Sequence, residues 1–464
     1  MSTKADRFFS YIQGRKVGFI GVGVSHTQLI RLFCQKGAKV SLRDRRTAQE
    51  LGDLAKEFQD LGVELILGDG YLENFHEEIL LRSPGVYYNL PAIQQAREQG
   101  IVVTSEMELF FDLCPCPTVA VTGSDGKTTT TTLISEMLKA QGKKVHLGGN
   151  IGRALLPEIE QIDPEDVAVV ELSSFQLISM RCAPTISVVT NVSQNHLDVH
   201  GTMEEYIDAK KNIFLHQNAF SRTVINQDNA ITRGFLPLVR GVACTFSRKE
   251  TPHRGAYLAP DGDLYYQDGS VAHRIMSAKE IVIPGLHNVE NYLAAITALW
   301  GWVSVETIRQ VAQTFHGVEH RIEFVRELDG VRYYNDSIAT TPSRTMAALN
   351  AFPGGLILLA GGYDKKLSFE PMAQKVNENV KILILMGATA QTMAQTFQNH
   401  PSHQKGGPQI YFVENMEQAI AKARSLAKPG DVVALSPACA SFGLYHNFEE
   451  RGRDFKARVL ALDA

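Results

Sequence analysis

Short apolar runs alternate with longer amphipathic stretches along the whole chain, and turn residues separate them. The runs at 119–121, 167–170 and 356–359 have the length of buried strands, and the stretches between such runs carry apolar residues at helical spacing. Strands that alternate with helices in this way are typical of α/β proteins. We therefore expect an α/β fold with parallel sheets throughout.

The same rhythm predicts three domains. We expect a Rossmann-like domain over 1–105, a central domain with a mainly parallel sheet over 106–317, and a second Rossmann-like domain over 318–464. The first domain opens with Lys16-Val-Gly-Phe-Ile-Gly-Val-Gly23, a helix that continues to Lys36 and a strand that ends at Asp44. His26 stands at the third glycine position of a dinucleotide fingerprint, so the pattern only weakly indicates NAD or FAD.

The second domain contains the stretch Val119-Ala-Val-Thr-Gly-Ser-Asp-Gly-Lys-Thr-Thr-Thr130, which reads as a strand, a glycine-rich loop and a helix from about 129 to 141. Gly123 and Gly126 allow backbone N–H groups to turn toward phosphate oxygens. Lys127 can reach the β and γ phosphates, and the Thr128 hydroxyl can complete the shell of a Mg²⁺ ion. The loop is shorter than the usual Walker spacing, but its strand and helix context predicts a nucleotide-phosphate site.

Polar residues end several strands of this domain. Glu171 is the last residue of an apolar strand. Because burying an unpaired charge is costly, we expect its carboxylate to meet a metal held by the loop. His196 and Asp198 follow the next strand. Their position at the carboxyl end of a strand favours a metal or phosphate role over a purely structural one. For Lys210 and Lys211, spacing alone favours a solvated basic face.

Two further patterns leave alternatives open. Asn288 and Asn291 share one helical face, where such amides cap a helix or read an adenine edge. The turn Ser83-Pro-Gly85 before a helix over about 90–99 is either a phosphate contact or a simple connection. In the third domain, polar residues at strand ends are candidates for lining one cleft, namely Asp336, Thr340, Lys365 and Ser441.

Composition restricts the partners. The 464 residues are 44% hydrophobic and 21% charged, with a net charge of −4, which gives no general attraction to nucleic acid or anionic membrane. Six scattered cysteines lack zinc-ligand spacing and suit a reduced cytoplasm. No apolar run approaches the roughly twenty residues that cross a bilayer. We expect a cytoplasmic protein, a monomer, with small-molecule partners.

Taken in order, these motifs resemble the ATP-dependent peptidoglycan-precursor (Mur) ligases over nearly the whole chain. The short phosphate loop, Asn195-His196, Gly285-x-His-Asn-x-x-Asn291 and His320-Arg321 are features of that superfamily. Glu171-Leu-Ser-Ser-Phe-Gln176 and Ser436-Pro-Ala-Cys-Ala-Ser-Phe442, with Asn447-Phe-Glu-Glu-Arg-Gly452, look like the members that add D-glutamate to UDP-N-acetylmuramoyl-L-alanine. The resemblance implies phosphorylation of a carboxylate by ATP and attack of the D-glutamate amine on the acyl phosphate.

The resemblance also implies roles for individual residues. Lys127, Glu171, His196 and Lys210 would be catalytic, and two Mg²⁺ sites would use Thr128, Glu171, His196 and a carbamylated Lys210, which reverses the spacing-based interpretation of Lys210. The positions implied for ATP are Gly123, Ser124, Asp125, Gly126, Lys127, Thr128, Thr129, Asn288, Asn291, Arg321 and Asp336. Those implied for the UDP-substrate are Val24, Ser25, Asp44, Arg45, Ser83, Gly85, Asn150, Ser173 and Gln176. Those implied for D-glutamate are Thr340, Lys365, Ser441, Phe442 and Phe448.

The chain departs from the family pattern at two positions. Ile338 stands where the family commonly has lysine, for which Lys365 or Lys366 are candidate substitutes, and His26 replaces a glycine near the implied uridine site, where its side chain could stack or hydrogen-bond. The alternatives are a related ligase with another acid or acceptor, such as a folylpolyglutamate synthase-like enzyme, and a non-catalytic ATP-binding regulator. The uridine-type first domain argues against the former, and the set of Lys127, Glu171, His196 and Lys210 argues against the latter.

Overall fold

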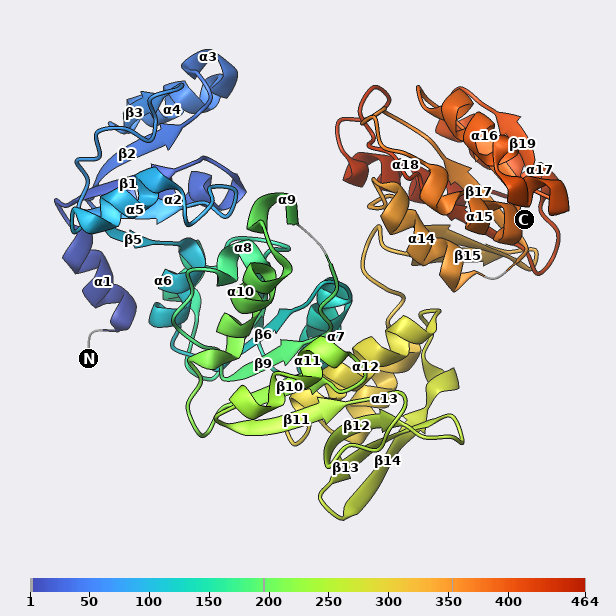
Figure 1. The fold of residues 1–464 in the computed structure, drawn as a ribbon, viewed down its shortest axis with the longest axis horizontal. Helices are drawn as coiled ribbons and strands as arrows, with labels where there is room; N and C mark the ends of the chain where they lie inside the picture. The colour runs from blue at the N-terminus through green and yellow to red at the C-terminus, as the bar shows by residue number, and fades with distance from the viewer. Residues whose placement is uncertain (1–2, 195–196, 353, 464) are drawn as a thin grey trace. The chain divides into compact units, whose positions relative to one another are not determined.

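The computed structural model describes residues 3–194, 197–352 and 354–463. Its chain divides into two compact units. The first consists of Met1–Glu280 and Val289–Gln313, and the second of Ile281–Asn288 and Thr314–Ala464. Figure 1 shows the α/β layering of each unit, with helices packed on the faces of the sheets.

The first unit begins with a five-stranded parallel sheet in the order β3-β2-β1-β4-β5. The three central strands, β2, β1 and β4, are almost entirely buried, as parallel strands covered on both faces must be, whereas the edge strands β3 and β5 are partly exposed. The elements are α1 (Lys4–Ile12), β1 (Lys16–Ile20), α2 (Val24–Gln35), β2 (Lys39–Asp44), α3 (Ala48–Leu51), α4 (Asp53–Asp60), β3 (Glu64–Leu67), β4 (Ile79–Arg82), α5 (Pro91–Glu98) and β5 (Val102–Thr104). This strand order is that of an open, doubly wound Rossmann-type sheet. In such sheets, ligands bind at the carboxyl ends of the strands.

The helix α6 (Glu106–Leu113) leads from this sheet into a six-stranded parallel sheet in the order β11-β10-β9-β6-β8-β7. β6, which precedes the phosphate loop, lies between β8 and β9. The elements are β6 (Thr118–Thr122), α7 (Lys127–Ala140), β7 (Val145–Gly149), β8 (Val167–Glu171), α8 (Ser174–Leu177), β9 (Ile186–Val189), α9 (Leu197–His200), α10 (Met203–Leu215), β10 (Arg222–Asn226), α11 (Ala230–Arg233), β11 (Val242–Phe246), α12 (Leu286–Leu299) and α13 (Val305–Thr314).

The expectation of parallel sheets throughout is wrong in two places. β12 (Arg254–Leu258), β13 (Asp263–Asp268) and β14 (Val271–Ser277) form an antiparallel sheet of three strands. In the second unit, β15 (Glu323–Leu328) runs antiparallel to β16 (Val331–Asn335). The Asp329-Gly330 turn between these two strands has positive φ at both residues, 50° and 72°, as a tight hairpin of this twist requires.

The second unit is built around a six-stranded sheet in the order β15-β16-β20-β17-β18-β19, which is parallel apart from β15. The remaining elements are α14 (Pro342–Ala351), β17 (Leu356–Ala360), α15 (Glu370–Asn379), β18 (Val380–Leu385), α16 (Ala390–Asn399), β19 (Gln409–Phe412), α17 (Met416–Leu426), β20 (Val432–Leu435) and α18 (Phe448–Leu460). β16, β20 and β17 are neighbours, so the segments that follow them meet at one edge.

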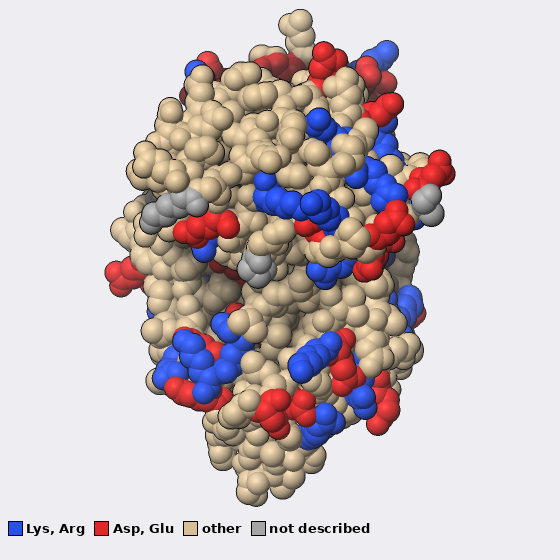
Figure 2. Space-filling view, turned by 90° about the vertical axis from the view of Figure 1, so that its right-hand side faces the viewer, with Lys and Arg blue, Asp and Glu red and all other residues tan. Residues whose placement is uncertain are grey.

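Surface charge is mixed. Figure 2 shows Lys and Arg side chains interspersed with Asp and Glu over the face that it displays, in line with the net charge of −4. No helix among the described residues is long and apolar enough to cross a membrane.

Candidate nucleotide and substrate sites

The phosphate loop connects β6 to α7 through two glycines in conformations that other residues avoid. Gly126 has φ of 77° and caps α7, which therefore begins at Lys127, two residues before the predicted start. Gly123 has φ of 153°, and a Cβ atom there would lie 1.9 Å from Thr190 Oγ1. Only glycine fits at this approach of the loop to the end of β9.

Residues after β9 fix the loop. The backbone N–H of Ser124 donates to Asn191 O at 2.9 Å, and that of Asp125 to Asn191 Oδ1 at 2.9 Å. The Ser124 hydroxyl donates to Ser193 O and contacts the Tyr206 hydroxyl, each at 3.0 Å. Lys127 Nζ donates to Ser124 O at 2.9 Å. These bonds give Ser124 a bracing role, which motif reasoning did not anticipate.

Glu171 lies at the carboxyl end of β8, beside β6, and is 1% exposed. One carboxylate oxygen, Oε1, accepts a hydrogen bond from Asn150 Nδ2 at 2.8 Å. The other, Oε2, is buried and has no hydrogen-bond partner among the described residues. An unsatisfied buried carboxylate oxygen is costly in isolation, and a bound cation would compensate it. The Glu171 carboxylate is therefore suited to the role predicted for it, that of a Mg²⁺ ligand.

Lys210 lies on α10 and is also 1% exposed. Its Nζ donates to Gly123 O at 2.7 Å, so the amine lies against the phosphate loop. Burial, reinforced by the charge of Lys127, holds the pKa of Lys210 well below its ordinary value, while Asp125 and Glu171 act in the opposite direction. The solvated basic face that spacing alone favours is thus wrong for Lys210, because the amine is buried and its charged form is disfavoured there.

The predicted metal ligand His196 lies outside the described residues, as does Asn195. Across the described chain, no group of three or more His, Cys, Asp or Glu side chains converges in metal-ligand geometry. Of the predicted ligands that are described, only Glu171 belongs to those four types.

The two asparagines of α12 differ in their contacts. Asn291 Oδ1 accepts a hydrogen bond from Thr130 Oγ1 at 3.2 Å, and a Cβ atom on Gly126 would lie 2.4 Å from it. Asn291 therefore packs directly against the phosphate loop. Asn288 Nδ2 donates to Pro284 O at 2.6 Å and holds the turn before the helix.

The implied uridine residues surround the glycine turn after β1. A Cβ atom on Gly21 would lie 2.6 Å from Ser83 Oγ, so the turn and Ser83 are in close contact. Asp44 accepts from Val22 N at 2.8 Å and forms an ion pair with Arg46 at 2.8 Å. Asp44 thus braces the turn. Arg45 and Gly85 are exposed, and Val24 opens α2.

His26 points into the core instead of the implied uridine site. Its ring is 1% exposed, its Nδ1–H donates to Gly21 O at 2.7 Å, and it meets Phe19 edge-on at 5.3 Å. Burial lowers the pKa of His26 to about 4. The hydrogen bond and the edge-on ring contact of His26 are thus both made within its own domain.

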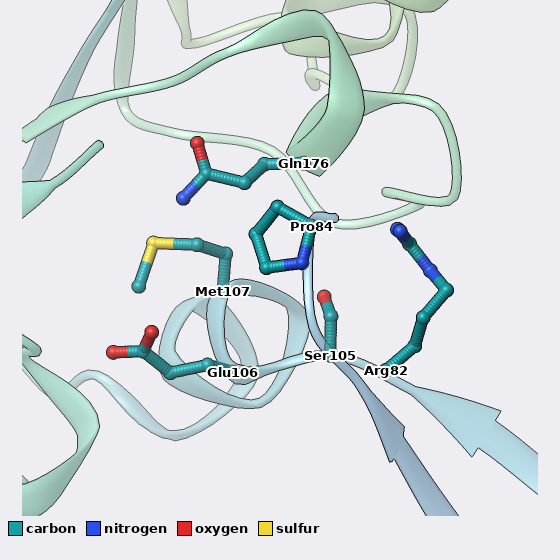
Figure 3. A pocket seen from close by; sticks show the side chains of 6 residues that line it. All are labelled: Arg82, Pro84, Ser105, Glu106, Met107 and Gln176. Carbon is teal, nitrogen blue, oxygen red and sulfur yellow. The ribbon is translucent and has the colours of Figure 1, made fainter. Parts of the chain in front are cut away.

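Ser173 and Gln176 form a capping box at the start of α8. Ser173 Oγ accepts from Gln176 N, and Gln176 Oε1 accepts from Ser173 N at 2.9 Å. Gln176 lines a small pocket together with residues of the N-terminal sheet and of α6 (Figure 3). The other lining residues are Arg82, Pro84, Ser105, Glu106 and Met107. Within the first unit, Gln176 and the Ser83–Gly85 turn are thus brought together.

In the second unit, Asp336 is buried at the end of β16. Ser436 Oγ, at the end of β20, donates to Asp336 Oδ2 at 2.6 Å, and Ile322 N donates to Oδ1 at 3.2 Å. Burial raises the pKa of Asp336 to about 7, against the opposing effect of these bonds and of Arg321 and Arg344. Arg321 Nε is buried without a partner among the described residues.

The implied D-glutamate residues come from segments that follow the three neighbouring strands. Tyr363 pairs with Ala440 as an isolated bridge, which brings the segment of Lys365 beside that of Ser441 and Phe442. Ser441 is buried, whereas Lys365 and Phe442 are exposed. The hydroxyl of Ser337, three residues before Thr340, donates to Phe448 O at 2.8 Å.

Sequence reasoning missed two arginines. Arg344, in the first turn of α14, donates to the carbonyl of Ile338 at 3.2 Å and shares the surroundings of Arg321 and Asp336. It is therefore a further candidate, besides Lys365 and Lys366, to supply the cation absent at position 338. Arg82 is 1% exposed at the end of the apolar β4. A charged residue that closes an apolar strand was the available signal for Arg82, as it was for Glu171.

Together, the three α/β sheets and the glycine-lysine-threonine loop after β6 define a multidomain protein of the nucleotide-phosphate-binding class. Comparison with protein families gives the particular family. Residues 15–105 match the Mur ligase MurD-like N-terminal domain, 121–299 the Mur ligase middle domain, and 320–439 the Mur ligase glutamate ligase domain. The chain belongs to the Mur ligase family.

Full-length relatives agree. The chain is 49% identical over 467 residues to the UDP-N-acetylmuramoylalanine--D-glutamate ligase of Acetivibrio thermocellus, and 47% identical over 463 residues to that of Clostridium beijerinckii, with 100% of each chain covered. The UDP-N-acetylmuramate-alanine ligase of Thermotoga maritima, a solved structure, matches with a TM-score of 0.57 at 17% identity and covers 96% of this chain and 99% of its own. That structure supports the fold alone.

Proposed function

We infer that the chain is an ATP-dependent ligase that adds D-glutamate to UDP-N-acetylmuramoyl-L-alanine in peptidoglycan precursor synthesis. One observation carries this inference in the structure. A buried carboxylate with an unsatisfied oxygen, Glu171, and a buried amine, Lys210, lie beside the phosphate loop of a chain that matches D-glutamate ligases from end to end.

ATP binds at the loop in this proposal. The first backbone N–H groups of α7 and the positive end of its dipole receive the phosphates, and Lys127 moves from Ser124 O to the β and γ oxygens. Asn288 and Asn291 contact the adenine. Arg321 and Asp336 serve the phosphates and ribose.

Thr128, Glu171, His196 and Lys210 are the residues that would hold two Mg²⁺ ions. Bound there, Mg²⁺ supplies neutralising charge to the transferring phosphoryl group. Lys210 contributes as a carbamate: its neutral amine adds to CO₂, a C–N bond forms and one proton is released to solvent. The low pKa of Lys210 favours this step, since only the unprotonated amine is nucleophilic. The resulting carboxylate-like oxygens suit a hard cation.

The reaction proceeds in two transfers. The carboxylate of UDP-N-acetylmuramoyl-L-alanine attacks the γ-phosphorus of ATP, ADP leaves, and an acyl phosphate forms. The amine of D-glutamate then attacks the acyl carbon, a proton is lost, and inorganic phosphate leaves as the amide bond forms. The protein contributes position and charge and needs no covalent nucleophile. The residues assigned to the UDP-substrate are the nine implied by the resemblance, namely Val24, Ser25, Asp44, Arg45, Ser83, Gly85, Asn150, Ser173 and Gln176. Lys365 pairs with the side-chain carboxylate of D-glutamate.

Phosphate release from ATP tests the proposal. The assay contains Mg²⁺ and UDP-N-acetylmuramoyl-L-alanine, with D-glutamate, L-glutamate, D-aspartate, L-lysine or no amino acid. We expect release only with D-glutamate and a product heavier by one glutamyl residue. Release with another amino acid alone would overturn the acceptor, and absence of release under every pairing would favour a non-catalytic regulator.

A further inference from the structure

Within the first unit, a buried guanidinium connects the N-terminal sheet to the central sheet. Arg82 is the last residue of β4, and its side chain is 1% exposed. Burying such a charge is costly unless its N–H groups are satisfied, so the acceptors that it reaches are informative.

The two terminal nitrogens of Arg82 bond to different domains. Nη1 donates to Val86 O at 2.7 Å and to Ser83 O at 3.3 Å, which holds the turn after β4. Nη2 donates to Phe175 O at 3.0 Å and to Ser179 Oγ at 3.3 Å, which holds the segment of α8 in the central domain.

Glu108 of α6 completes the arrangement. Its Oε2 accepts from Ser105 Oγ at 2.9 Å and from Ser179 Oγ at 3.1 Å. The Ser179 hydroxyl therefore accepts from Arg82 while it donates to Glu108. This relay brings a negative charge near the buried guanidinium, in keeping with the favourable interaction between Arg82 and Glu108.

The two segments held by Arg82 are those that carry implied contacts to the two ends of the UDP-substrate. Ser83 and Gly85 lie in the turn after β4, and Ser173 and Gln176 flank Phe175 in the α8 segment. Figure 3 shows Pro84, from that turn, and Gln176 at the same pocket, with the Arg82 side chain beside them.

We propose that Arg82 is a positioning residue that sets the turn Ser83–Val86 against the α8 segment, and so preorganises the two halves of the UDP-substrate site. This inference rests on the proposed function. Both terminal nitrogens of Arg82 are engaged by protein acceptors, which leaves it a positioning role. Its effect is to remove the cost of ordering the two segments against each other when substrate binds. A lysine cannot replace it, because one ammonium lacks the planar fork that reaches acceptors on both sides.

Two variants and a matched control test the proposal. Arg82→Lys keeps the charge but loses the fork, and Ser179→Ala removes only the relay hydroxyl. Arg97→Lys is the control. Arg97 Nη2 donates to Tyr88 O at 3.3 Å and its guanidinium lies 4.0 Å from the Tyr88 ring, and among the described residues it makes no hydrogen bond to the central domain. Initial rates give KM for each of the three substrates.

For Arg82→Lys we expect KM for UDP-N-acetylmuramoyl-L-alanine to rise about tenfold or more, the scale of losing charge-assisted hydrogen bonds. KM for ATP and for D-glutamate should stay within about twofold. Ser179→Ala should shift the same KM in the same direction by less, and serves if Arg82→Lys does not fold. Arg97→Lys should leave all three values unchanged. Equal changes in all three KM values, or none in either variant, would overturn the proposal.

Hydrogen exchange separates this inference from the proposed activity. Amides of 83–88 and 173–179 should exchange faster in Arg82→Lys than in the parent protein, whereas Arg97→Lys should leave 173–179 unchanged. If the parent protein shows no D-glutamate-dependent turnover but this exchange pattern appears, the proposed function fails and the coupling of the two segments stands. Unchanged exchange at 173–179 in an active protein refutes the coupling.

Discussion

The burial of His26 predicts an acid-labile N-terminal domain. Its Nδ1–H donates to Gly21 O, so the neutral ring carries its proton there, and Nε2 is buried with no partner in the described part of the chain. Protonation of Nε2 would place a positive charge in this core, near Arg82. We expect His26→Met, which cannot titrate, to remove this source of acid sensitivity.

The magnitude follows from the pKa of His26, which falls from 6.5 to about 4, first because of burial and also because of the charge on Arg82. A depressed pKa in the folded state means that the stabilisation is present above pH 6.5 and is lost as the pH falls toward 4. At about 1.4 kcal/mol per pH unit, the difference corresponds to roughly 3 kcal/mol. That is a large fraction of the stability of a domain.

Hydrogen exchange of the β1 amides (Lys16–Ile20) measures the free energy of opening of this domain separately from the rest of the protein. It would be followed from pH 7.5 to pH 4 in the parent protein and in His26→Met. As the pH falls, we expect the free energy of opening of His26→Met to gain about 3 kcal/mol relative to that of the parent protein. Parallel pH profiles would refute the reasoning, because the other titrating groups are common to both proteins.

Substitutions at four further residues test the sites and the packing around them. Lys210→Ala and Lys210→Arg should both lower D-glutamate-dependent phosphate release by about a hundredfold or more, since neither can form a carbamate; near-normal activity of either would exclude that role. Glu171→Gln should raise the Mg²⁺ concentration for half-maximal rate by about tenfold, measured by titration. Arg344→Ala should raise KM for ATP by about tenfold, and an unchanged KM would leave it a structural role only. Burial raises the pKa of Glu106 from 4.5 to about 7, so the stability that its protonated form contributes is full below pH 4.5 and is lost as the pH rises through 7. Between pH 4.5 and 8.5, the free energy of unfolding of Glu106→Gln, measured by urea denaturation, should gain up to about 3 kcal/mol relative to the parent protein.

The phosphate loop was predictable because its determinants are contiguous. Gly123 and Gly126 are required by the backbone itself, and the strand and helix that flank them are neighbours in sequence. The length of β9 was less accessible. It ends at Val189, and the side chains of the next two residues, Thr190 and Asn191, bond the phosphate loop at Asp125. Hydrogen bonds between segments that are far apart in sequence leave no pattern in the local sequence that would predict the end of a strand.

The antiparallel strands illustrate a different failure. Asp329-Gly330 between apolar runs, and Asp261-Gly262 before β13, are turn signals that favour hairpins. They were present in the sequence, but the regular strand and helix alternation elsewhere outweighed them. The burial of Lys210 and the bonds of Arg82, by contrast, depend on segments that are far apart in sequence, and spacing cannot reveal them.

How buried charges are satisfied distinguishes structural from functional sites in this chain. Arg43 and Glu77 are fully buried, yet they pair at 2.6 Å, and backbone carbonyls and Ser41 satisfy the rest of their polar atoms. Glu171 is as deeply buried and keeps one oxygen without a partner among the described residues. Because such a defect costs stability, its retention beside the phosphate loop is explained by a ligand that binds there. On this argument, Glu171→Gln should cost activity while it leaves the ligand-free protein at least as stable.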